Sequence, residues 1–165
     1  MANITGNRSL HFDTLSQGMS EAERLMSFPT KTVGHFTHAQ NIDHLARTLR
    51  IVVGDDTAPK FPQWLKWVVR LRLTAILTQP SKPGIRLPSG IQSRFWTEEN
   101  IRLDEAMQFL REAYHRFEET KANGFPIHPL FGKLTNEQHE QLQCRHFELH
   151  LGMIVASQSP SPSQP

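Results

Sequence analysis

The feature that most constrains the fold is a helix start signal that recurs along the chain. Residues 14–17, 37–40 and 135–138 each form a capping box, with Thr in the first position and Gln in the fourth. In a capping box the Thr hydroxyl accepts from a first-turn amide, and the Gln side chain reaches back to the Thr amide. Thr97, followed by two glutamates where the helix dipole favours negative charge, is a fourth candidate N-cap. Four such signals predict a helical bundle.

The apolar residues after each start signal support this prediction. They recur at spacings of three and four, which is typical of one buried stripe on a helix. No segment shows the alternation that is typical of a strand. We therefore predict an all-α four-helix bundle with main helices beginning near residues 14, 37, 97 and 135. The predicted stripes are Leu15, Met19, Ala22 and Met26; Ile42, Leu45, Leu49 and Val52; Leu103, Met107, Leu110, Tyr114 and Phe117; and Leu142, Leu149 and Met153.

The region between the second and third start signals has a different composition. Residues 61–77 are apolar with interspersed Lys and Arg, and predict a short extra helix in a long crossover connection. A membrane-surface helix would explain this pattern, but a helix that covers the bundle or forms a dimer contact explains it as well and is preferred. Residues 80–90 are rich in Pro and Gly and predict a loop. We expect one domain over residues 1–156 and a disordered Ser/Pro tail over residues 157–165.

Length and composition exclude several classes of protein. A chain of 165 residues with 38% hydrophobic and 21% charged residues is typical of one globular domain. Its formal net charge of +2 is too small to imply nucleic acid or membrane lipid as a partner. The single cysteine, Cys144, excludes an internal disulfide and fits a reducing compartment. With no signal-peptide pattern at the N-terminus, the expected location is the cytoplasm.

One pair of histidines, His146 and His150, has the spacing of two metal ligands on one helix face. Random placement of nine histidines would give roughly half a pair at this spacing, so the spacing alone decides nothing. A metal site needs a third ligand from another helix, and His44 is the best candidate. From the residues alone, a buried histidine bonded to a neighbouring carbonyl explains His44 better than a metal ligand does.

The remaining candidates rank lower. His115 falls on the polar face of its helix, and His139 is expected at the rim of the site. Cys144 is expected to be a small buried residue. The role of His128, which opens the stretch His-Pro-Leu-Phe-Gly, is left open.

Two stretches carry a resemblance to a known family. Residues 128–152, "HPLFGKLTNEQHEQLQCRHFELHLG", and residues 36–49, "FTHAQNIDHLARTL", resemble signatures of an uncharacterised branch of the DinB-like (YfiT-like) metalloenzyme superfamily. The resemblance covers roughly residues 8–155. Two positions depart from the pattern: Leu149 replaces a usual histidine, and His139 replaces an aromatic residue.

The resemblance implies a four-helix bundle that holds a divalent metal ion, such as zinc, nickel or iron, on His44, His146 and His150. Some members of the wider superfamily are thiol-dependent transferases. The expected function is therefore that of a metal-dependent thiol transferase acting on a small molecule, with a low-molecular-weight thiol as partner. Two alternatives remain: a non-catalytic metal-binding or structural bundle, expected as a homodimer, and a hydrolase that uses metal-bound hydroxide.

Overall fold

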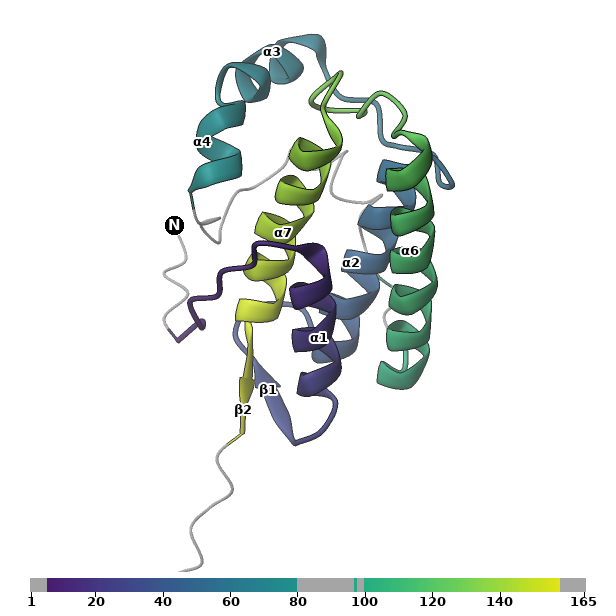
Figure 1. Ribbon diagram of the computed structural model, residues 1–165. Helices are drawn as coiled ribbons and strands as arrows, with labels where there is room; N and C mark the ends of the chain where they lie inside the picture. Colours follow the sequence, from purple (N-terminus) through teal and green to yellow (C-terminus); the bar gives the residue numbers. More distant parts are fainter. Residues whose placement is uncertain (1–5, 80–96, 98–99, 158–165) are drawn as a thin grey trace, which may run out of the picture.

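The computed structural model describes residues 6–79, 97 and 100–157, and the described part is mostly helical (Figure 1). The helical fold class is confirmed, while the finer assignment to a DinB-like four-helix bundle stays a prediction. The predicted loop at residues 80–90 lies outside the described residues, as does the tail beyond Ser157. The elements in chain order are α1 (Leu15–Leu25), β1 (Thr30–Thr32), α2 (His38–Val53), α3 (Gln63–Leu71), α4 (Leu73–Thr78), α6 (Leu103–Asn123), α7 (Asn136–Gly152) and β2 (Ile154–Ala156).

Three helices begin where the capping boxes predict. Thr14, Thr37 and Thr135 are the N-caps of α1, α2 and α7. The box is complete at Thr37 and Thr135, where the Gln side chain accepts from the N-cap amide. At Thr14 it is only half formed, because the Gln17 side chain accepts from the amide of Asp13 instead.

The fourth start prediction, at Thr97, is wrong. The helix α6 begins at Leu103, its N-cap is Arg102, and no side chain caps it. Asp104 and Glu105 lie in the first turn, so the favourable interaction with the helix dipole comes from these two carboxylates. The start therefore coincides with Leu103, the first residue of the predicted apolar stripe.

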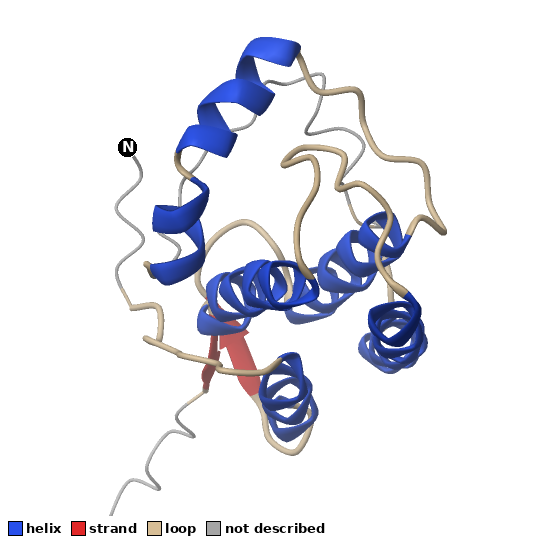
Figure 2. Cartoon of the chain, turned by 45° about the horizontal axis from the view of Figure 1, so that its top comes forward, coloured by secondary structure: helices blue, strands red, loops and turns tan. Residues whose placement is uncertain are grey.

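The single helix predicted over residues 61–77 is two helices. The backbone leaves helical geometry at Arg72, which has φ −100° and ψ 7° and separates α3 from α4. The change of direction turns Leu73 and Leu77 of α4 onto Phe131, and the three form a small second core. In both views α3 lies at the periphery of the described structure (Figure 2), and α4 leads back from it to contact α7.

The chain also contains a strand pair that the sequence analysis did not predict. Strands β1 and β2 are antiparallel, with Thr30 opposite Ala156 and Thr32 opposite Ile154. Three residues are too few for an alternating pattern to stand out. Because β2 directly follows α7 and β1 lies shortly before α2, the ribbon ties together the end of α7 and the start of α2.

The main core lies between the four longer helices. In pairs, α2 packs along α6 and across α7, and α1 packs against α7 and α6. The stripes predicted for α1, α2 and α6 supply most of this core. The stripe predicted for the last helix is wrong, because Leu142, Leu149 and Met153 are only partly buried. The apolar residues that α7 buries are Cys144, Phe147 and Leu151.

The reason for this difference is that α7 is covered on several sides. It contacts α1, α2 and α4, and it also binds the N-terminal segment. There, Glu148 Oε1 accepts from the amide of Phe12 at 2.6 Å, and Arg145 donates to the Phe12 carbonyl at 2.7 Å. A helix with neighbours on several sides buries polar residues too, so a one-stripe pattern does not describe it. Among the described residues, no helix is long and apolar enough to cross a membrane.

Candidate metal centre

The three predicted ligands come from two helices whose ends are tied together. His44 lies in the first half of α2, after the capping box at Thr37. His146 and His150 lie in the last two turns of α7. The two helices are in contact, and their ends in this region meet at the β1–β2 ribbon (Figure 1). The fold therefore brings together residues that are about a hundred positions apart in the sequence.

The structure brings the three histidines to one point. Each has a ring nitrogen within 4.8 Å of a ring nitrogen of the other two. The Nε2 atoms of His44 and His146 are 3.2 Å apart, close enough to share a proton. For two ligands about 2.0–2.1 Å from a tetrahedral zinc ion, the expected separation is about 3.3–3.4 Å. The observed spacing therefore suits two ligands of one ion.

Burial keeps the two histidines of α7 in the form that can bind a metal. It lowers the pKa of His146 to about 3, with a smaller contribution from His44. The pKa of His150 is also well below its usual value, first because of burial and then because of His44 and His146. A neutral imidazole has a lone pair for a metal ion, whereas a protonated one does not. Both rings are therefore available as ligands near neutral pH.

The orientation of His150 is fixed by Asn41, which is one turn before His44 on α2. The amide nitrogen of Asn41 donates to the carbonyls of Phe36 and Thr37. Its oxygen is therefore the acceptor for His150 Nδ1, at 2.9 Å. His150 must then carry its proton on Nδ1, which leaves the Nε2 lone pair for the ion. Metal-ligating histidines commonly donate their second ring nitrogen to an oxygen in this way.

An aromatic ring covers part of the site. The Phe36 ring is stacked on His150 at 6.2 Å between centroids and tilted against His44 at 5.8 Å. His44 and His150 are 9% and 8% exposed, and His146 is the more accessible of the three.

The carboxylates that flank the ligands in the sequence face other partners. Glu148 is buried against Arg145 and the Phe12 amide. Asp43 is fully buried and pairs with Arg47 at 2.8 Å. Neither joins the cluster of potential ligands among the described residues. At many histidine metal sites a carboxylate orients the ligand. Here the amide of Asn41 has that role.

The other histidines are separate from this cluster. His115 is exposed on α6, as predicted, and pairs with Glu119. The rim position expected for His139 is wrong: its ring is 1% exposed and stacks on Phe125. His128 lies close to it, and its Nδ1 accepts from the amides of Leu130 and Phe131. His139 is buried because α7 is enclosed at this level, which one helix's periodicity does not reveal.

The predicted burial of Cys144 is confirmed. The side chain is fully buried and lies outside the cluster of potential ligands. Burial raises the pKa of its thiol to about 12. A thiol with this pKa is neutral and inert near pH 7.

Sequence reasoning missed the parts played by Asn41 and Phe36. Asn41 has a signal that could have been used, because Asn is a poor helix former and here lies inside a helix on the same face as His44. A polar residue at such a position needs a hydrogen-bond partner. Phe36 has no comparable signal, because it lies before the helix and only the tertiary fold places its ring on His150.

Comparison with known proteins gives one match. A family model described as a protein of unknown function (DUF1569) matches residues 4–157. The searches of curated proteins and of solved structures found no match. The matched range includes both helices that carry the three histidines and the β1–β2 ribbon that joins their ends.

Proposed function

The chain belongs to the DUF1569 family of proteins of unknown function, and we propose that it binds a divalent metal ion through His44, His146 and His150. The observation that carries this proposal is the convergence of three ring nitrogens within 4.8 Å from two different helices. The hydrogen bond from His150 to Asn41 supports it, because that bond leaves the Nε2 lone pair of His150 for the ion.

The donor set limits the choice of metal. Three imidazoles suit zinc, nickel and iron, whereas calcium and magnesium prefer oxygen ligands. Three neutral protein ligands leave the full charge of the ion and at least one coordination position for another molecule. A bound divalent ion in such a site supplies Lewis acidity and favours an anionic ligand.

We further propose that this ligand is a low-molecular-weight thiol and that the protein is a thiol-dependent transferase. This second proposal, on the class of reaction, is more specific than the proposal of metal binding. It rests on the resemblance to DinB-like proteins. One observation favours an external thiol: Cys144 is buried and its pKa is raised to about 12, so the chain's own cysteine does not supply a thiolate. The second substrate would be an electrophilic small molecule.

Hydrolysis is the less favoured reaction. It needs a group to take a proton from the attacking water. Among the described residues, the carboxylates nearest the ligands in sequence, Asp43 and Glu148, are paired with arginines. The non-catalytic alternative is a metal-binding or structural protein. It differs from the transferase and the hydrolase in that it turns over no substrate.

The first experiment tests metal binding itself. We expect untagged protein to contain close to one equivalent of a transition metal, and the metal-free protein to bind Zn²⁺ or Ni²⁺ with one-to-one stoichiometry in a calorimetric titration. His146→Ala should lose this binding, because two imidazoles remain. His115→Ala, at an exposed position on α6, should bind like the wild type. Equal binding by wild type and His146→Ala would contradict the proposal.

The second experiment tests the reaction. The metal-loaded protein is incubated with a panel of small thiols and electrophiles, and free thiol is measured over time. We expect thiol consumption that His146→Ala abolishes and His115→Ala does not. Ester or amide turnover without thiol consumption would favour the hydrolase, and no turnover would favour the non-catalytic protein.

A further inference from the structure

The α3 helix exposes an apolar stripe that no described residue covers. Trp64, Trp67 and Leu71 are 62%, 66% and 82% exposed, and Val68 is 46% exposed. Their spacing of three, four and seven residues places them on one face of the helix. The inner side of α3 reaches the rest of the protein through Val69, which packs against the small core formed by α4 and Phe131. The stripe therefore faces largely away from the described part of the protein.

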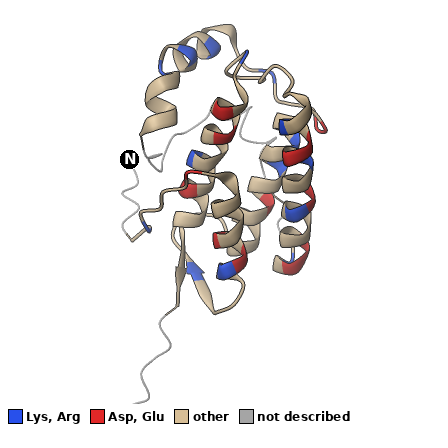
Figure 3. Ribbon diagram, in the orientation of Figure 1, with Lys and Arg blue, Asp and Glu red and all other residues tan. Residues whose placement is uncertain are grey.

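The same end of the molecule carries positive charge that forms no ion pair with a carboxylate of the described residues. Residues 57–79 contain Lys and Arg but no Asp or Glu, and Figure 3 shows blue on α3 and no red on either α3 or α4. Lys60, Lys66, Arg70, Arg72 and Lys133 form no ion pair with a described carboxylate. Every other described Arg or Lys except Lys31 forms one.

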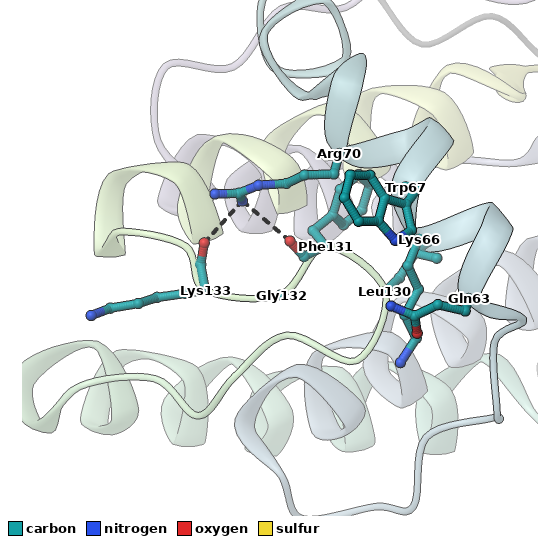
Figure 4. Close-up of a pocket in the computed structure, with 8 residues that line it drawn as sticks. All are labelled: Gln63, Lys66, Trp67, Arg70, Leu130, Phe131, Gly132 and Lys133. Carbon is teal, nitrogen blue, oxygen red and sulfur yellow. Dashed lines mark hydrogen bonds between the residues drawn. The ribbon is translucent and has the colours of Figure 1, made fainter.

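Stripe and charge meet at a cleft of about 320 Å³ between α3 and the loop before α7 (Figure 4). Trp67 belongs to both the stripe and the cleft wall. Arg70 crosses to the loop, where it donates to the carbonyls of Phe131 and Lys133 at 3.2 and 2.9 Å. These bonds fix α3 on the loop but leave the positive charge of Arg70 unpaired. Lys66 and Lys133 line the same cleft.

We propose that the α3 surface, comprising the stripe and the unpaired Lys and Arg residues, docks onto an anionic lipid membrane. A surface helix of this kind buries its apolar face at the level of the headgroups, where Trp is favoured, and its cations attract anionic lipids. The proposal concerns binding at the surface only. It is independent of the metal centre, which lies near the β1–β2 ribbon at the opposite end from α3 (Figure 1).

Two other occupants suit the surface less well. Pairing of two α3 helices would bring their unpaired cations together, and one nine-residue helix is small against the roughly 20–30 residues a side of a stable interface. Single-stranded nucleic acid would stack on Trp64 and Trp67, but it gains little from Val68 and the highly exposed Leu71. A lipid surface uses both the aliphatic and the aromatic side chains.

The test is sedimentation of the full chain with phosphatidylcholine vesicles that contain or lack about a third phosphatidylserine. We expect binding only to the anionic vesicles, weakened by high salt and accompanied by a blue shift of the Trp fluorescence. Leu71→Glu should reduce binding at least ten-fold. It replaces the most exposed residue of the stripe by a negative charge, which the anionic lipid repels. Arg72→Gln should reduce it about five-fold, the effect of one cation near an anionic surface.

The matched control is Ser20→Glu, which adds the same charge at an exposed position of α1 and should bind like the wild type. Circular dichroism and melting of each variant establish that it is folded. Absence of vesicle binding by the folded wild type, or equal binding by Leu71→Glu, would overturn the proposal. A dimer that Leu71→Glu dissociates, or binding of a single-stranded oligonucleotide in place of vesicles, would overturn it in favour of those partners.

Discussion

At the scale of single residues, Asn41 decides which nitrogen of His150 faces the metal centre. Its two carbonyl contacts fix the amide so that the oxygen points to His150 Nδ1. A side chain without this oxygen would leave the imidazole free to turn or to change tautomer. The residue thus acts on the metal only through His150.

We predict that Asn41→Leu lowers the affinity for Zn²⁺ by about 10–100-fold, the usual effect of losing such a hydrogen bond. Asn41→Asp keeps an acceptor oxygen for His150 but loses both donors to the carbonyls of Phe36 and Thr37, so it should recover only part of the affinity. Competition with a chelator of known affinity measures both variants, and melting of the metal-free proteins separates a loss of stability from a loss of binding. Unchanged affinity in Asn41→Leu would show that Asn41 has no role in orienting the ligand.

A second residue-scale feature is the buried pair of His128 and His139. Both ring nitrogens of His139 lack a hydrogen-bond partner among the described residues. Burial lowers the pKa of His139 to about 4, and burial together with His139 lowers the pKa of His128 to about 3. Both values lie below the value of about 6.5 in an unfolded chain. As the pH falls, the unfolded chain therefore binds protons before the folded protein does.

We predict that the free energy of unfolding falls as the pH drops from about 6.5 towards 4, by up to about 1.4 kcal/mol per pH unit for each such histidine. His139→Phe should reduce this slope and raise stability at pH 7, because it removes buried polar atoms without partners and keeps a ring against Phe125. Urea unfolding at pH 7.5 and pH 5 measures the effect. The exposed His115→Phe serves as control, and equal slopes in wild type and His139→Phe would contradict the prediction.

At the scale of elements, the packing of α1 on α7 depends on Gly18. A Cβ atom at this position would lie 2.8 Å from Cδ1 of Phe147, a ring that is fully buried in the core. The two helices can approach this closely only because Gly18 has no side chain. The contact also supports the helix that carries His146 and His150.

We predict that Gly18→Ala destabilises the protein by about 1–3 kcal/mol, the usual cost of adding a methyl group to a packed core. The higher helix propensity of Ala would offset up to about 1 kcal/mol of this cost. Ser20→Ala, at an exposed position of the same helix, should be neutral or slightly stabilising. Chemical denaturation of both variants gives the comparison, and a stabilised Gly18→Ala would show that α1 and α7 can separate freely.

At the scale of the whole molecule, the metal centre would link α2 and α7, two helices that are far apart in the sequence and come together only when the chain folds. An ion that binds the folded state and not the unfolded chain stabilises the protein by about 2.7 kcal/mol when free metal is a hundred times Kd. For a chain of this size, that corresponds to a rise in melting temperature of roughly 5–10 °C. We predict this rise on adding Zn²⁺ or Ni²⁺ to the metal-free protein, and its reversal by a chelator. His44→Ala should abolish it, and an equal rise in that variant would contradict binding across α2 and α7.

Much of the helical architecture follows from local sequence. The threonines at positions 14, 37 and 135 start helices because capping depends on a few neighbouring residues, and three apolar stripes lie in the core because their periodicity matches the helix. Local sequence signals gave wrong predictions where helix boundaries depend on contacts with distant parts of the chain. Thr97 was predicted to start a helix that in fact begins at Leu103, and residues 61–77 break at Arg72 so that α4 can pack on Phe131.

The sequence by itself determined where three of the four longer helices begin, which faces of α1, α2 and α6 are buried, and which three histidines to examine. Only the tertiary structure decided that these histidines meet, because His44 is about a hundred residues from its partners and no helical period spans that distance. It also decided that Asn41 orients His150, that His139 is buried, and that the α3 stripe faces outward. Each of these depends on which surfaces of different elements come into contact, and periodicity within one element carries no information about its neighbours.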